Sequence, residues 1–180
     1  MKLDSNFTFE KYGLKVRLVN ENDASFIVNL RTDPKLGRYI NPTPSDISQQ
    51  IKWIREYKQR EKEGTDYYFI YYFQDEPIGV NRIYNIHENY ASAGSWVCRK
   101  GLVPAQVFAT SIICREIFFE ILNIEEYRFE VRKANKQVLR FHKLCGAKIT
   151  EENELDYFLI LTKMEFNNHK ENLLKLLKLN

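Results

Sequence analysis

The sequence is short of the features that mark several large classes of protein. It has three cysteines and no Cys-x-x-Cys pair, which argues against a disulfide framework and against a cysteine-rich zinc site. No apolar run approaches the roughly 20 residues that cross a bilayer. The first residues, MKLDSNFTFEKYG, lack the apolar segment of a signal peptide. These absences predict a cytoplasmic protein with reduced thiols and no membrane contact.

A dense basic stripe is also missing. The net charge is +3, and lysine and arginine alternate with glutamate along the chain, so we expect no nucleic-acid partner. The three histidines, His87, His142 and His169, have no metal-ligand spacing with the cysteines, and we expect no bound metal. The chain is 44% hydrophobic and 28% charged over 180 residues. That composition predicts one globular domain, residues 1–180, with its core between about 14 and 166.

The hydrophobic periodicity predicts an alternation of strands and helices. The expected strands lie at 14–20, 66–73, 77–86, 92–98, 127–132, 147–150 and 156–166. The expected helices lie at about 20–31, 45–62, 106–122 and between Asn135 and Gly146, and a leucine-rich tail, 167–180, forms a further amphipathic helix. A meander followed by a strand–helix–strand crossover gives a mixed, mostly antiparallel sheet with a central parallel pair and helices on both faces. This is an α/β fold.

The stretch VRKANKQVLRFHKLCGAK (131–148) places a histidine on the apolar face of a helix. Val138, Phe141, His142 and Cys145 share one face by their spacing, and basic side chains occupy the other. Two interpretations of His142 are open from the residues alone. It is a packing histidine with one satisfied nitrogen, or a proton donor in the wall of a pocket.

Several segments, in this order over most of the chain, resemble the GNAT family of acyl-CoA-dependent N-acetyltransferases. Asn135, Gly146 and the helix between them look like the family's N-x-x-A-x-x-x-Y-x-x-x-G-F segment, and GSWVC (94–98) looks like its cofactor-binding strand. EPIG (76–79) is similar to its hairpin entry. VRLVNENDASFIVNLRTDP (16–34) is similar to the branch that acetylates ribosomal proteins. LRTDPKLGRYINPTPSDISQQIKWI (30–54) is closer still to the branch that acetylates nucleotide-linked amino sugars.

The resemblance implies an acetyl-CoA site between strands 92–98 and 127–132. The pyrophosphate would bind at the start of the following helix, because helix N-termini attract anions. The implied cofactor-binding residues are Val97, Cys98, Arg99, Lys100, Gly101, Leu102, Val103, Ala105, Gln106, Val107 and Asn135. Leu102, Ala105 and Val107 stand where the family usually has Gln or Arg, Gly, and Gly or Ala. A Cβ there crowds a phosphate that needs close backbone approach. Asn135 is equally suited to cap the following helix.

The resemblance also implies catalytic roles. His142 stands where the family commonly has a tyrosine that protonates the leaving thiolate, and imidazole has a pKa of about 6.5 that suits donation, although burial opposes its charged form. Glu88 is the candidate base that deprotonates the acceptor amine, and its alternative is a solvated loop charge. Cys98 is expected to pack within its strand, since no histidine is positioned to make it a nucleophile.

The acceptor is expected to be a small-molecule amine, preferentially that of a nucleotide-linked amino sugar. Arg31, Arg38 and Gln50 are the implied substrate-binding residues, because arginine binds phosphate through paired hydrogen bonds. Arg31 is also suited to the C-terminal end of its helix. Two alternatives for function are a ribosomal-protein or peptide N-terminal acetyltransferase and a non-catalytic acyl-CoA sensor. The leucine-rich tail is either a homodimer contact or a helix docked on its own domain.

Overall fold

The computed structural model describes residues 2–179. Eight strands form one sheet in the order β1-β2-β3-β4-β5-β6-β8-β7. The strands are β1 Thr8–Lys11, β2 Leu14–Leu18, β3 Asp66–Phe73, β4 Glu76–Tyr84, β5 Tyr90–Cys98, β6 Glu126–Arg132, β7 Lys148–Glu152 and β8 Asp156–Thr162. Neighbouring strands are antiparallel except for β5 and β6, which are parallel. The expected mixed sheet with a central parallel pair is confirmed.

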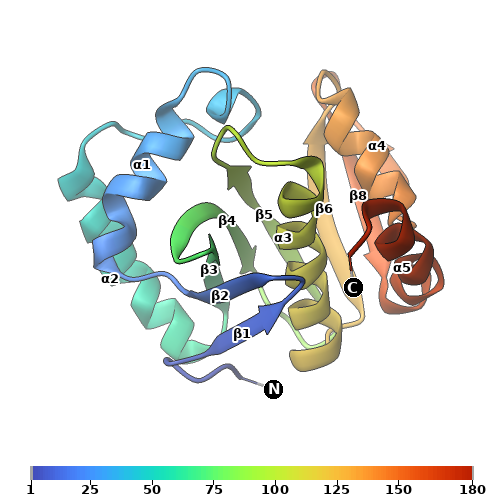
Figure 1. The fold of residues 1–180 in the computed structure, drawn as a ribbon, viewed down its shortest axis with the longest axis horizontal. Coiled ribbons are helices and arrows are strands. Elements are labelled where there is room, and N and C mark those ends of the chain that lie inside the picture. Colours follow the sequence, from blue (N-terminus) through green and yellow to red (C-terminus); the bar gives the residue numbers. More distant parts are fainter. Residues whose placement is uncertain (1, 180) are drawn as a thin grey trace.

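Helices cover both faces of this sheet (Figure 1). They are α1 Ala24–Thr32, α2 Ile47–Glu63, α3 Pro104–Glu116, α4 Lys136–Leu144 and α5 Lys163–Leu177, with short η1 Glu21–Asp23, η2 Gly37–Tyr39 and η3 Ile117–Ile121. α1 and α2 pack on one face around Ile27, Ile54 and Tyr57. α3, α4 and α5 pack on the other, where α3 supplies Ile112, Ile113 and other members of the larger core. No helix among residues 2–179 is long and apolar enough to cross a membrane.

The helix ends follow the capping chemistry of the sequence. Asn20 and Asp23 form a reciprocal capping box at η1. Asp46 caps α2, which ends at Gly64 in the left-handed conformation at φ 80°. Asn135 caps α4 by accepting a hydrogen bond from the Val138 amide.

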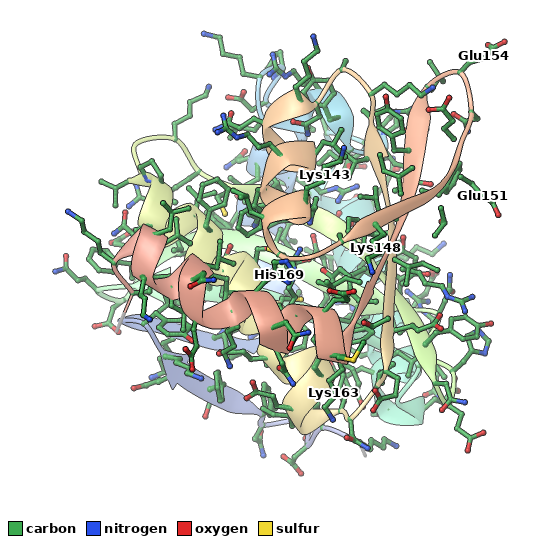
Figure 2. The ribbon with its side chains drawn as sticks, turned by 90° about the vertical axis from the view of Figure 1, so that its right-hand side faces the viewer. Lys143, Lys148, Glu151, Glu154, Lys163 and His169 are labelled. Atoms are coloured by element: carbon green, nitrogen blue, oxygen red, sulfur yellow. The ribbon has the colours of Figure 1, made fainter. Side chains whose placement is uncertain are left out.

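Gly146, just beyond α4, is required by its surroundings as well as by its φ of 95°. A Cβ there would lie 2.8 Å from Nδ1 of His169 and 3.0 Å from the Glu165 carbonyl oxygen, both on α5. Figure 2 shows His169 between α5 and the C-terminal end of α4. The glycine therefore lets the two helices approach.

Three elements differ from the expectation. β1 pairs with β2 through a turn at Tyr12 and Gly13, both at positive φ, and it was not expected because TFEK is a short edge strand. α3 begins at Pro104 rather than Gln106, since proline suits the first helical turn. The closing strand ends at Thr162, where Thr162 Oγ1 caps α5 by accepting from the Glu165 amide. Lys163–Phe166 is thus helical rather than extended.

Candidate active site

The parallel strands β5 and β6 separate after a short paired segment. Their pairing covers only Tyr90–Ser92 with Glu126–Arg128, yet β5 continues to Cys98 and β6 to Arg132. From Ala93 and Phe129 onward the two strands have no ladder with each other, so their facing backbone groups are free to bind a ligand. The two strands thus leave a wedge-shaped opening between them in the middle of the sheet, which we call the wedge.

A β-bulge in β5 lies in the part of this strand that borders the wedge. Val80 and Arg82 of β4 face Val97 and Gly94, so Ser95 and Trp96 together oppose Asn81. Ser95 has a φ of 53°, which is uncommon for a residue with a Cβ. A bulge interrupts the ladder and re-aims side chains. The buried Nδ2 of Asn81, opposite the bulge, has no hydrogen-bond partner among residues 2–179.

On the α1–α2 face, Ser95 lines a cavity of about 300 Å³. Its wall is formed by Arg31, Pro42, Thr43, Pro44, Gln49, Gln50, Trp53, Tyr68, Arg82 and Ser95. We call this the Ser95 cavity. Two of these residues are cationic and none carries a carboxylate. Arg31 is held by Thr43 Oγ1 at 2.5 Å and by the Asn41 carbonyl at 3.2 Å. The hydroxyl of buried Tyr68 has no hydrogen-bond partner within residues 2–179.

A second cavity, of about 540 Å³, adjoins the first through Trp53 and Arg82. Here Asp66, only 2% exposed, accepts hydrogen bonds from both Arg60 and Arg82. Both guanidinium groups lie over the Trp53 ring, at 5.4 and 5.0 Å from its centroid. Cations and an aromatic face therefore line the two cavities together. We call this second space the Asp66 cavity.

On the opposite face, His142 packs between the two diverging strands. Its ring centroid lies 4.3 Å from that of Phe129 on β6 and 6.1 Å from that of Trp96 on β5. Nδ1 of His142 lies 2.6 Å from Nη2 of Arg115 on α3. Burial, and then the charge of Arg115, hold the pKa of His142 well below 6.5. A neutral imidazole is the form that this environment favours, which opposes its service as an imidazolium acid.

Cys98 is buried at the end of β5. Its Sγ lies 3.6 Å from Oγ1 of Thr110, and burial raises the pKa of the thiol to about 11. A thiol with that pKa is a poor nucleophile near neutral pH. The same close packing involves Gly79, where a Cβ would lie 2.6 Å from the Cys98 sulfur.

The loop between β5 and α3, residues 99–103, carries five of the eleven expected cofactor-binding residues. Arg99 is exposed, and Lys100 forms an ion pair with Asp33 at the end of α1. This hydrogen bond from Lys100 lowers the pKa of Asp33 to about 2. A Cβ at Gly101, φ 83°, would meet nothing within 4 Å, so open space adjoins the loop.

The first turn of α3 already uses some of its amides. Gln106 and Val107 donate to the Val103 carbonyl, and the Val103 amide donates to Oε1 of Gln106. An anion at this helix start would therefore depend on Ala105 and on the loop at Gly101 and Leu102.

The remaining expected residues occupy different places. Gln50 and Arg31 line the Ser95 cavity. Arg38 is exposed and lies over the ring of Tyr39, whose hydroxyl donates to the Ala134 carbonyl at 3.2 Å. That bond links the α1–α2 connection to the β6–α4 connection.

Glu88 is an exposed residue in the β4–β5 connection, at the paired end of β5. Ser95 lies several residues further along that strand, which advances about 3.3 Å per residue. The structure therefore does not bring Glu88 to the Ser95 cavity.

Sequence reasoning missed four residues of this site. Trp53 lies in a helix and Arg82 in a strand, and neither belongs to a motif that marks a binding site. The bulge at Ser95 could have been predicted from Gly94, because a glycine within a strand pattern often marks a bulge. Arg115 carries no local signal, because its partner lies on another helix.

Comparisons with known proteins agree with this geometry. Residues 14–148 match the family model described as an acetyltransferase (GNAT) domain. Among proteins with curated descriptions, none matches the chain. The apo structure of FdhC, described as a nucleotide-linked sugar GNAT, is 36% identical, covers 93% of this chain and 96% of its own, and superposes with a TM-score of 0.83.

Two more distant structures share the fold. The ribosomal-protein-S5-alanine acetyltransferase of Vibrio fischeri is 14% identical, with a TM-score of 0.75 over 87% of this chain and 97% of its own. Campylobacter jejuni PseH in complex with acetyl coenzyme A is 19% identical, with a TM-score of 0.62 over 82% and 99%. The fold, the divided strand pair and the matched model define an acyltransferase. The chain belongs to the GNAT family and is an N-acetyltransferase.

Proposed function

We propose that the protein transfers acetyl from acetyl-CoA to the primary amine of a nucleotide-linked amino sugar. The observation that carries the proposal is the Ser95 cavity, which is cationic, contains no carboxylate in its wall and opens beside the β5 bulge. FdhC, a nucleotide-linked sugar GNAT 36% identical over nearly the whole chain, supports the same acceptor class.

The residues at the wedge fit acetyl-CoA, which supplies an activated acetyl thioester when bound. The unpaired edges of β5 and β6 offer backbone groups to the amide-rich arm of CoA. Asn81 adds a buried donor without a partner among residues 2–179. The open space beside Gly101 and the N-terminal end of α3 suits the pyrophosphate.

The Ser95 cavity favours the reactive form of an amine. Arg31 carries positive charge in its wall, while the charge of Arg82 is balanced by Asp66. A nearby like charge lowers the pKa of a bound ammonium group. More of the acceptor is then neutral near pH 7, so no carboxylate base is required in the wall. The neutral amine attacks the thioester directly, and its positioning at the wedge supplies much of the rate. Backbone amides at the bulge and at Cys98 polarise the carbonyl, whereas the Val97 amide faces β4 within the ladder.

The paired cavities suit an acceptor with an amine at one end and a nucleotide at the other. The sugar fits the Ser95 cavity, closest to the wedge, and the Asp66 cavity adjoins it. Arg82 lines both cavities and suits phosphate oxygens. Trp53 presents an aromatic ring between them, and aromatic rings stack on bases.

The acceptor is tested by measuring release of free CoA thiol with a panel of amines. The panel contains dTDP- and UDP-linked amino sugars, the free amino sugars, spermidine, and peptides with ribosomal-protein N-termini. We expect turnover with at least one sugar nucleotide and a much lower kcat/KM with its free sugar, because the free sugar lacks the phosphates.

Two other outcomes would replace the proposal. Preferential turnover of a peptide would favour an N-terminal acetyltransferase, the alternative that the cationic cavity disfavours for basic peptides. Saturable CoA binding without turnover across the panel would favour a non-catalytic sensor.

A further inference from the structure

Arg115 is a fully buried cation without a carboxylate partner. It is 0% exposed, and no carboxylate lies within ion-pair distance of it in the described chain, 2–179. Its Nη1 donates to the Ser111 carbonyl at 2.9 Å. Its guanidinium carbon lies 5.2 Å from the ring centroid of Tyr127 and 5.3 Å from that of Phe141. Burial of an unpaired charge is costly, so a compensating role is worth seeking.

The contact between Arg115 and His142 fixes a tautomer. A guanidinium group has donors only and cannot accept a hydrogen bond. Nη2 of Arg115, 2.6 Å from Nδ1 of His142, must therefore donate to it. Because Nδ1 accepts, the proton of the neutral imidazole resides on Nε2. The guanidinium charge further draws electron density from the ring and strengthens Nε2–H as a donor.

The ring that carries this donor lies at the wedge. His142 packs against Phe129, which directly follows the last paired residue of β6, and against Trp96 in the β5 bulge. Helix α4 supplies His142, and α3, on the same face of the sheet, supplies Arg115 (Figure 1). Two helices thus place one imidazole ring beside the point where the strands diverge.

We propose that Arg115 is a positioning residue that holds His142 as the neutral Nε2–H tautomer, so that Nε2–H donates a hydrogen bond to the departing CoA sulfur. The inference rests on the acetyl transfer proposed above. His142 then acts as a fixed hydrogen-bond donor rather than as an imidazolium acid.

The transfer balances without a proton from His142. A bond forms between the amine nitrogen and the acetyl carbon, and the carbon–sulfur bond breaks. Its electron pair leaves on sulfur as the CoA thiolate, which accepts the hydrogen bond from Nε2–H. The amine loses one proton to solvent, and the thiolate is protonated by water after release. Hydrogen bonds to charged groups are the stronger ones.

The direct test is the tautomer of His142 in the folded wild-type protein, read from the ring nitrogen shifts by ¹⁵N NMR. The chain has three histidines, so single His87→Gln and His169→Gln variants assign the signals. We expect neutral Nε2–H at His142 from about pH 8 to about pH 5.5, below the ordinary imidazole pKa of about 6.5. An Nδ1–H tautomer, or an imidazolium at pH 7, would overturn the proposal.

An Arg115→Met variant separates positioning from packing. We expect an Nδ1–H population to appear and the pKa of His142 to rise. The kcat should fall by about 10- to 100-fold, the value of a charge-assisted hydrogen bond, with little change in KM for acetyl-CoA. A purely structural Arg115 would alter stability and leave tautomer and kcat as they are.

If Arg115→Met fails to fold, two changes at His142 still test the donor. His142→Gln retains a side-chain N–H, and His142→Phe has none. We expect His142→Gln to keep about tenfold more kcat than His142→Phe. Equal rates in the two folded variants would refute the donor role, while acetyl transfer itself would stand. Absence of any acetyl transfer in wild type would instead refute the proposed function and leave the NMR result interpretable.

Discussion

Arg115 and Glu116 are adjacent, fully buried and oppositely charged, yet they face different partners. Arg115 reaches His142 on α4. Glu116 accepts hydrogen bonds from Lys11 at 2.9 Å and Tyr12 at 2.7 Å, and pairs with Lys170 at 2.6 Å. Successive residues of a helix point about 100° apart, since a turn takes 3.6 residues. Arg115 thus contacts His142 beside the wedge, while Glu116 holds α3 to the β1–β2 hairpin and to α5.

The single residue His142 is expected to make the free energy of unfolding depend on pH. Folding holds its pKa well below 6.5, so the unfolded chain binds a proton near pH 6.5 that the folded chain does not. Its stabilising contribution is therefore present above pH 6.5 and is lost as pH falls. We expect the free energy of unfolding to drop by up to about 1.4 kcal/mol per pH unit from this group below about pH 6.5.

Urea unfolding between pH 7.5 and 5.5 measures this dependence, with His142→Gln as the control. The difference between wild type and variant should narrow as the pH falls, because glutamine does not titrate. A wild-type stability that runs parallel to that of the variant across this range would show that His142 titrates normally.

Arg82 is the residue through which the acceptor is most directly tested. It lines both cavities and donates to Asp66 at 2.7 Å. We expect Arg82→Gln to raise KM for a sugar nucleotide about tenfold, the effect of losing a charge-assisted hydrogen bond, with a smaller effect on KM for acetyl-CoA. Steady-state kinetics measure both constants.

Arg55→Gln is the matched control, because Arg55 on α2 is an exposed arginine that pairs with Glu21 outside both cavities. It should leave KM unchanged. Equal effects of the two substitutions would indicate a general charge effect rather than a contact with the acceptor.

At the scale of elements, the bulge in β5 is expected to be essential to the site. Ser95 is held at φ 53°, which a β-branched residue adopts only with strain. Ser95→Gly should preserve the bulge and the activity. Ser95→Val should lower kcat by about tenfold through a shift of about 1–2 kcal/mol in backbone energy. Measuring kcat for the two variants tests this prediction. If Ser95→Val has the same kcat as Ser95→Gly, the backbone conformation of the bulge is not needed for catalysis.

Glu116 joins three elements, since Lys11 and Tyr12 belong to the β1–β2 hairpin and Lys170 to α5. Its side chain is 1% exposed, and removing one member of a buried charge network is strongly destabilising. We expect Glu116→Gln to lower the free energy of unfolding by about 2–3 kcal/mol, the value of hydrogen bonds to a charged group. Chemical denaturation measures it.

Glu120→Gln provides the comparison for Glu116→Gln. Glu120 also pairs with Lys170, but its side chain is 44% exposed, and an exposed pair contributes about 0–1 kcal/mol. If the two variants lose similar amounts of unfolding free energy, the burial of Glu116 does not strengthen its interactions.

The sequence predicts an element well when the residues that determine it are close together in the chain. The turn at Gln74 and Asp75, where both residues adopt positive φ, lies between the expected strands 66–73 and 77–86. The capping box of Asn20 and Asp23 lies at the expected start of the helix at about 20–31. His142 was identified because helical spacing exposes one face of α4. Arg115 escaped because only the packing of α3 against α4 brings it to His142, and no periodicity encodes that contact.

At the scale of the whole molecule, the meander, the central parallel pair and the helices on both faces were predictable, whereas the β1–β2 edge hairpin, the place of β8 beside β6 and the cavities were not. A meander followed by a right-handed crossover leaves few arrangements of the sheet, and the observed order follows them. The Ser95 cavity, in contrast, is built from α1, α2, their connection, β3, β4 and β5 together. α5 docks on its own domain through Phe166 and Leu173, and a homodimer stays a prediction.

The account rests on acetyl-CoA binding in the wedge, beside the loop and helix start proposed to hold its pyrophosphate. There Leu102 replaces the family's usual glutamine or arginine, and Val107 replaces its usual glycine or alanine. Isothermal titration of the purified protein with acetyl-CoA, repeated with CoA, measures this most directly. We predict saturable binding of both ligands, because the facing edges of β5 and β6 are unpaired and open space adjoins the loop at Gly101. A correctly folded protein that binds neither ligand would contradict the account.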